Sequence, residues 1–108
     1  MKYSRVHLDS LGYELPPVVV TSAELEQRIA PMYEALRIAP GQIEALTGIV
    51  ERRWWERGYP VSQGAVAAAR KALERSNVKA SDLEVVIYGG VCRENFEPAT
   101  ACVVASSL

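Results

Sequence analysis

The sequence predicts an α/β fold, because strand-like and helix-like stretches alternate along its 108 residues. The clearest strand covers residues 83–91, where consecutive β-branched side chains leave no polar face. Such a run is typical of a parallel strand that is covered on both sides. A long amphipathic helix precedes it and a shorter strand precedes that helix, which together predict a right-handed βαβ unit. The length predicts one domain rather than two.

The chain is expected to begin with a strand over residues 5–14, where apolar side chains partly alternate, and two prolines end that strand. Residues 18–20 continue in an extended conformation up to Thr21. Thr21 is followed three positions later by Glu24, which is the spacing of a capping box, where each residue bonds the other's backbone N–H. A helix is therefore predicted to begin at this threonine.

This first helix is predicted to have an apolar face and one interruption. Residues four, three and four positions apart form the face: Leu25, Ile29, Met32 and Leu36. Pro31 lies within this stretch, so the helix is expected to kink there or to restart with Pro31 in a first turn. A Pro-Gly pair then closes the segment, and residues 42–46 are expected to form one short helical turn.

A further strand is predicted over residues 49–55, and three consecutive charged residues place it at a sheet edge or running out to the surface. A Tyr-Pro pair ends it. Ser62 is the expected N-cap of a long helix that continues to Ser76. Its apolar side chains are expected to face inward and its charged ones outward, the charged ones being Arg70, Lys71, Glu74 and Arg75.

The last segment, residues 98–108, contains no charged side chain and predicts a helix with Pro98 at its first position. A helix that is apolar all round belongs in an interior, packed on several sides. The other elements are too few to cover both this helix and the strand over residues 83–91. Residues 1–108 are therefore expected to be an incomplete domain, whose remainder lies in further sequence or in a second polypeptide.

The composition excludes several classes of protein. With 12 Lys+Arg against 13 Asp+Glu, the net charge of −1 argues against a nucleic-acid or anionic-membrane partner. No apolar run reaches membrane length and the start lacks the apolar stretch of a signal peptide, so a soluble cytoplasmic protein is expected. Two cysteines ten positions apart make neither a disulfide framework nor a zinc site. No metal and no cofactor is expected.

Several reactive residues also have a structural interpretation, which is favoured for each. Cys92 and Cys102 are interpreted as small buried hydrophobes, although a helix dipole near Cys102 would stabilise a thiolate. His7 has no acidic or cysteine partner at a local spacing. The pair Gly89-Gly90 indicates close packing or a bend rather than a phosphate-binding loop.

Two other places are candidate binding or catalytic positions. Arg52 and Trp54 lie in an Arg-Arg-Trp-Trp cluster that could stack on a nucleotide-bearing ligand, or form a solvated strand end with the tryptophan packed inward. Glu97 lies in the loop after the predicted central strand, directly before Pro98. Ligands of open α/β sheets gather at the carboxyl ends of strands, which makes Glu97 a candidate site residue. The alternative for Glu97 is a carboxylate that satisfies the helix dipole.

The ordered motifs resemble the N-terminal part of thiolase-fold condensing enzymes, specifically the ketoacyl synthase III group. Residues 47–53 resemble that group's Thr-Gly-Ile-x-x-Arg segment, and residues 67–73 resemble its alanine-rich helix. Residues 83–89 followed by 98–102 resemble its strand, loop and Pro-Ser-x-Ala-Cys helix. The resemblance implies the N-terminal part of a thiolase-like five-layer α/β/α/β/α fold.

Within this group, residues 96–102 most resemble the head-to-head branch. Those enzymes join two long fatty acyl-thioesters by a non-decarboxylative Claisen condensation, on the way to long-chain olefins. The resemblance implies that Glu97 enters the neighbouring subunit's active site as general base, so a homodimer is expected. A helix N-terminus would weaken such a base, and burial against an apolar acyl channel would strengthen it. Phe96, Arg52 and Trp54 are expected to contact the acyl-CoA or acyl-ACP thioester.

The family's nucleophilic cysteine lies downstream of this segment, which is therefore expected to be inactive alone and to need the remaining part of the same enzyme. Cys102 corresponds instead to a buried helix residue of the group. The Trp and Arg that hold coenzyme A in ketoacyl synthase III are missing from residues 42–46, which leaves the acyl carrier open. Alternatives are a ketoacyl synthase III with a malonyl-ACP extender, a small α/β binding module, and a free-standing hydrolase that uses Cys102.

Overall fold

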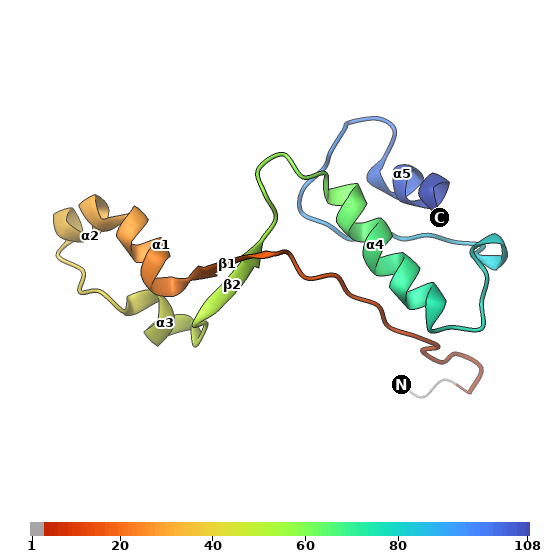
Figure 1. Ribbon diagram of the computed structural model, residues 1–108, viewed down its shortest axis with the longest axis horizontal. Coiled ribbons are helices and arrows are strands. Elements are labelled where there is room, and N and C mark those ends of the chain that lie inside the picture. The colour runs from red at the N-terminus through yellow and green to blue at the C-terminus, as the bar shows by residue number, and fades with distance from the viewer. Residues whose placement is uncertain (1–3) are drawn as a thin grey trace. The chain divides into compact units, whose positions relative to one another are not determined.

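The computed structural model describes residues 4–108, which form two compact units (Figure 1). One unit is the continuous stretch Leu15–Arg57. The other combines the N-terminal residues up to Glu14 with Gly58–Leu108. The two units are described in turn.

The first unit is built on a two-stranded antiparallel sheet. Strand β1, Val18–Thr21, pairs with β2, Glu51–Trp54, in a register that places Val20 opposite Arg52. Val20 is fully buried and anchors the small core of this unit. The extended conformation predicted for residues 18–20 is confirmed, and the strand predicted over residues 49–55 forms in a shorter version.

The helices of this unit follow the sequence signals closely. Helix α1, Ser22–Arg28, begins with the predicted capping box, in which Thr21 Oγ1 accepts from the Glu24 N–H at 3.1 Å and the Glu24 carboxylate accepts from the Thr21 N–H at 2.7 Å. Helix α2, Ala30–Leu36, restarts with Pro31 in its first turn. The helical turn predicted over residues 42–46 is α3, Gln42–Thr47.

The predicted apolar face of these helices is only partly buried, because Leu25 and Ile29 are half-buried and the other two residues are not. Met32 and Leu36 are exposed, whereas Glu26 and Tyr33 are buried. The reason is that Glu26 accepts backbone hydrogen bonds from Gly41, the N-cap of α3, and from Ile43 in its first turn, which draws this side of the helix inward. The spacing of apolar residues along the sequence gives no information about such a polar contact.

The second unit centres on α4, Val61–Glu74. Of the charged residues predicted to face outward, Arg70, Glu74 and Arg75 are exposed, whereas Lys71 is partly buried and forms an ion pair with Glu14 at 2.5 Å. The expected N-cap was wrong by two residues, because Pro60 is the cap and Ser62 lies inside the helix. The Ser62 backbone N–H donates instead to the Glu94 carboxylate at 3.0 Å. A carboxylate from a distant part of the chain thus does what the serine hydroxyl was expected to do.

The strands predicted over residues 5–14 and 83–91 are absent from the described part of the chain. Both segments run without regular secondary structure, and a single-turn 3-10 helix, Ala80–Asp82, precedes the second. A strand exists only where a neighbour pairs with its backbone, and residues 4–108 contain no such neighbour for either segment. The predicted βαβ unit is therefore not observed. Val85 is 73% exposed and Ile87 88% exposed.

The last helix, α5, is Thr100–Ser107, with Ala99 as its N-cap. Pro98 therefore lies before the cap and not at the first helical position, and the Glu97–Pro98 peptide is cis. Within residues 4–108, α4 covers one face of α5 (Figure 1), and the burial on several sides that was expected together with the remainder of the domain stays a prediction. Thr100 and Val104 are buried on that face, while Cys102 is exposed.

Candidate functional site

The loop between residues 88 and 99 forms one wall of a pocket at the start of α5, with a volume of about 370 Å³. Phe96 and Glu97 both line this pocket, together with Tyr88, Arg93 and Thr100. The structure thus brings together two of the four predicted site residues. The lining of this pocket combines an apolar ring with carboxylate, guanidinium and hydroxyl groups.

Glu97 is exposed and lies two residues before the N-cap of α5. Within residues 4–108 its carboxylate accepts no hydrogen bond, so the alternative that it satisfies the first N–H groups of the helix is not observed. A carboxylate without donors keeps its lone pairs available for a proton. Phe96, next to it, is 92% exposed and presents an apolar surface beside that carboxylate.

Glu94 is a residue that the sequence interpretation missed. Its carboxylate reaches the second residue of α4, Ser62, which is only 5% exposed. The helix N-terminus leaves backbone N–H groups without partners inside the helix, and Pro60 has no side chain that can accept from them. The absence of a capping residue before α4 was the available signal, but it did not indicate which acid would serve.

Arg52 lies on β2 in the other unit, and contacts within that unit account for much of its guanidinium. Its Nη2 donates to Ser22 Oγ at 3.1 Å, while the Ser22 hydroxyl donates to the Ile49 carbonyl. The Nη1 atom is buried and has no hydrogen-bond partner in the described residues. Arg52 therefore joins the start of α1 to β2.

Trp54 is 39% exposed, and its ring is covered on one face from within the same unit. The guanidinium carbon of Arg28 lies 5.2 Å from the ring centroid, in a cation–π arrangement. The fully inward packing considered for this tryptophan is not observed. Arg52 and Trp54 belong to the unit Leu15–Arg57, whereas Phe96 and Glu97 belong to the other unit.

Glu26, which the sequence analysis did not single out, accepts more hydrogen bonds than any other carboxylate of residues 4–108. It is 7% exposed and accepts from the backbone N–H groups of Gly41 at 2.6 Å and Ile43 at 2.8 Å, and from the Tyr33 hydroxyl at 3.3 Å. The hydrogen bond from Ile43, followed by that from Gly41, holds the pKa of Glu26 below its usual range. Burial, together with the charge of Glu26, raises the pKa of Tyr33. These three hydrogen bonds give the Glu26 carboxylate a structural role.

The remaining candidates form no reactive group. Cys92 and Cys102 are both free and exposed, so their interpretation as buried hydrophobes was wrong: α4 covers the opposite face of α5, and the Cys92 loop is open. His7 is exposed, and the strand predicted around it does not form. Nowhere in residues 4–108 do three His, Cys, Asp or Glu side chains come together as a metal site.

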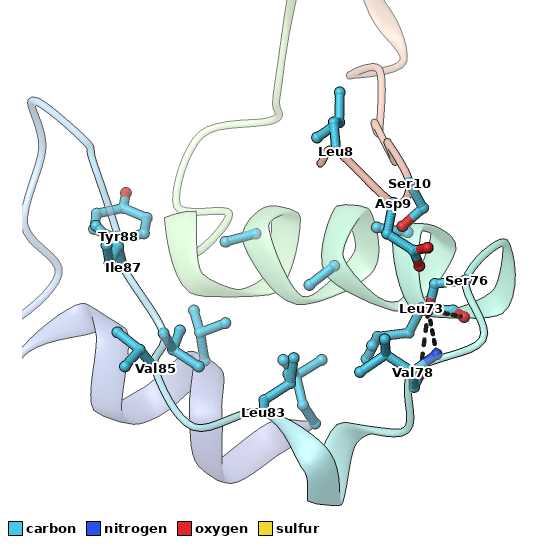
Figure 2. A pocket seen from close by; sticks show the side chains of 16 residues that line it. Leu8, Asp9, Ser10, Leu73, Ser76, Val78, Leu83, Val85, Ile87 and Tyr88 are labelled. Carbon is cyan, nitrogen blue, oxygen red and sulfur yellow. Dashed lines mark hydrogen bonds between the residues drawn. The ribbon is translucent and has the colours of Figure 1, made fainter. Parts of the chain in front are cut away.

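A larger apolar cavity of about 720 Å³ lies in the same unit as Glu97, between α4, α5 and residues 83–88 (Figure 2). Leu73, Leu83, Val85 and Val104 line it, and Asp9 is the one charged residue of its lining. It lacks paired acidic or basic groups, so it is a surface for apolar contact and not a reactive centre. None of the helices in residues 4–108 has the length and hydropathy needed to cross a membrane.

Comparison with known proteins identifies homologues of two kinds, although no family model matches the chain. The chain is 56% identical over all 108 residues to an acyl-CoA:acyl-CoA alkyltransferase of Shewanella oneidensis, of which it covers 31%. The structure of OleA from Xanthomonas campestris with cerulenin matches 92% of the chain with a TM-score of 0.83 and 33% identity. The 3-oxoacyl-(acyl carrier protein) synthase III of Xanthomonas oryzae matches 93% with a TM-score of 0.84 and 31% identity. The chain spans about 30% of the length of these proteins.

Proposed function

Because the chain is homologous to the N-terminal part of thiolase-superfamily condensing enzymes and has their α/β fold, we propose that it forms part of an acyltransferase that joins two fatty acyl-thioesters by Claisen condensation. The observation that supports this most strongly is the 56% identity, over all 108 residues, to an acyl-CoA:acyl-CoA alkyltransferase. The substrates are long-chain acyl-CoA or acyl-ACP thioesters, and the enzyme is a cytoplasmic homodimer.

The reaction has two steps. In the first, a cysteine in the remaining part of the enzyme takes an acyl group from a thioester and releases the carrier thiol. In the second, Glu97 removes a proton from the α-carbon of another acyl-thioester, and the resulting carbanion attacks the carbonyl carbon of the acyl-cysteine. A carbon–carbon bond forms, the bond to the cysteine sulfur breaks, and the proton held by Glu97 is free to return to the thiolate.

Two features of the pocket support Glu97 as this base. Its carboxylate is exposed and accepts no hydrogen bond within residues 4–108, so it can reach a substrate outside this chain. Phe96 provides an adjacent apolar surface for an acyl chain. The covering that would exclude water comes from the neighbouring subunit, whose active site Glu97 enters. Such a dry setting makes a carboxylate a stronger base.

A second candidate function is a decarboxylative synthase III reaction with a malonyl-ACP extender. It is favoured by the synthase III structure, which matches as well as OleA does. The two reactions differ in how the carbanion arises. Loss of carbon dioxide from malonyl-ACP generates the carbanion without a base, whereas condensation of two acyl-CoA molecules needs a group that removes the proton. A functional requirement for Glu97 therefore distinguishes them.

The test uses a chimera in which these 108 residues replace the matching segment of the Shewanella oneidensis enzyme. Given a long-chain acyl-CoA as the only substrate, the chimera is expected to form a 3-keto product that contains both acyl chains, detected by mass spectrometry. Product formation only after addition of malonyl-ACP, with release of carbon dioxide, would support the second function instead. The unaltered Shewanella enzyme is the positive control, and a chimera inactive with both donors would contradict both functions.

A further inference from the structure

We propose that Glu94 is a positioning residue, which holds the loop that bears Glu97 in place for proton abstraction. The inference rests on the function proposed above and deepens it, because it assigns a role to a residue that does not itself touch the reacting atoms. It follows from one long-range contact in the second unit, and from how little else fixes the loop.

The contact joins Glu94 to the N-terminus of α4, 32 residues earlier in the chain. Glu94 Oε2 accepts from the Ser62 backbone N–H at 3.0 Å, and Ser62 is buried. The first turn of α4 contains no acidic residue, and its N-cap, Pro60, makes no side-chain hydrogen bond. The positive end of the helix dipole therefore meets its negative charge in Glu94.

The same contact is what anchors the loop. Residues 91–99 are all exposed, and no other side chain of residues 89–98 has a hydrogen bond within the described part of the chain. Glu94 stands three residues before Glu97, near the middle of this loop. The helix that begins at Val61 thus supplies a rigid reference point for the base.

Proton transfer requires the base to lie within hydrogen-bond reach of the α-carbon proton. A misplacement of about 1 Å by a remote substitution can cost about a hundredfold in rate. Removal of the Glu94 carboxylate frees the loop and leaves Ser62 without its acceptor. The acyl loading step uses the downstream cysteine and not Glu97, so the loop anchor matters for condensation alone.

The test compares Glu94→Ala and Glu94→Gln in the full-length chimera, with Glu74→Ala as the matched control. Glu74 is an exposed glutamate in the last turn of α4, the helix that Glu94 contacts, and it has no hydrogen bond or ion pair in the described residues. Loading is measured as the first release of coenzyme A, and condensation as steady-state formation of the 3-keto product. We expect Glu94→Ala to lower kcat for condensation about tenfold or more, with loading unchanged. Glu94→Gln should retain most activity, because its amide oxygen accepts the same N–H.

Equal slowing of loading and condensation in Glu94→Ala would show a general structural effect and would overturn the inference. Condensation at the wild-type rate in Glu94→Ala would also overturn it. If Glu94→Ala does not fold, Glu94→Asp decides, because it keeps the charge but is one methylene shorter. A selective loss of condensation in Glu94→Asp supports the inference, and wild-type condensation rejects it. Glu97→Ala is measured in parallel: normal condensation there refutes the proposed base, whereas an inactive Glu97→Ala with a normal Glu94→Ala refutes only the anchor.

Discussion

At the scale of single residues, three glutamates show how surroundings separate chemically identical side chains. Glu26 is buried and accepts three hydrogen bonds, which stabilise its charged form. Glu94 accepts one, from a helix N-terminus. Glu97 accepts none within residues 4–108 and lines a pocket beside an exposed aromatic ring. The carboxylate with the fewest donors is the one suited to take a proton from a substrate.

Glu26 predicts a specific acid sensitivity of the first unit. Its folded-state pKa is lowered, so the carboxylate contributes stability that is present above its unfolded pKa and is lost as the pH falls through the folded value. Hydrogen exchange of the Gly41 and Ile43 amides should therefore accelerate in acid beyond its intrinsic pH dependence. Glu26→Gln should exchange faster at neutral pH and lose that extra acid effect. The same behaviour in Glu34→Gln, an exposed glutamate, would contradict this account.

At the scale of elements, the helices and turns that formed as predicted are the ones specified by local sequence signals. The Thr21–Glu24 capping box and the proline restart require only a few neighbouring residues, and both are present as predicted. The elements that failed depend on distant residues. Residues 83–91 have strand-like composition, but no backbone in residues 4–108 pairs with them. The N-cap of α4 was misplaced for the same reason, because its acceptor comes from Glu94.

The capping box predicts a measurable contribution of Thr21 to α1. Replacing an N-cap threonine by alanine costs about 1 kcal/mol, which corresponds to about a fivefold change in a local opening equilibrium. Amide exchange of Glu24 and its neighbours in α1 should accelerate by about that factor in Thr21→Ala. Thr21→Ser keeps the hydroxyl acceptor and should behave like the wild type. Equal exchange in the alanine and serine variants would show that the cap is not needed.

At Gly12 the backbone of the N-terminal segment lies directly against α4. A Cβ at Gly12 would collide with the Ala68 carbonyl oxygen and the Ala72 backbone nitrogen, and neither can move without disturbing the helix. Overpacking of this kind costs about 1–3 kcal/mol, so Gly12→Ala should lower the melting temperature of the chimera. Gly89→Ala, which would meet open space, is the matched control. A melting temperature lowered equally by both substitutions would argue against the close contact.

At the scale of the whole molecule, the chain is similar in fold and in sequence to the N-terminal part of proteins about three times its length. The α/β class and the thiolase-like resemblance are confirmed by these homologues. Several large apolar side chains are exposed in residues 4–108, including Val85, Ile87 and Phe96. The sequence predicted a strand that includes Val85 and Ile87, which does not form in these residues, and a substrate contact at Phe96, which stays a prediction.

The candidate site was predictable in part. Glu97 and Phe96 were identified through the order of motifs around Pro98, and the structure places both on one pocket. Glu94 and Glu26 were missed because their partners are backbone N–H groups. Nearly every residue carries such a group, so the sequence does not indicate which of them a carboxylate will contact. The burial of α5 on several sides stays a prediction, because within residues 4–108 α4 covers one of its faces.

The isolated chain is predicted to be inactive. The proposed mechanism draws its acyl-bearing cysteine from sequence beyond these residues, so mixing the 108-residue chain with a long-chain acyl-CoA should release no coenzyme A above the uncatalysed rate. The chimera, at the same concentration, should release it continuously. Release by the isolated chain that disappears in Cys102→Ser would indicate a hydrolase based on that cysteine.

The most direct measurement is coenzyme A release by the Glu97→Ala chimera when a long-chain acyl-CoA is the only substrate. General base catalysis contributes about 10²–10⁴-fold, so the variant should release about one equivalent per active site, from loading, and then stop. No 3-keto product should accumulate. Continued release with product formation at the wild-type rate would contradict the assignment of Glu97 as the base that makes condensation of two acyl-thioesters possible.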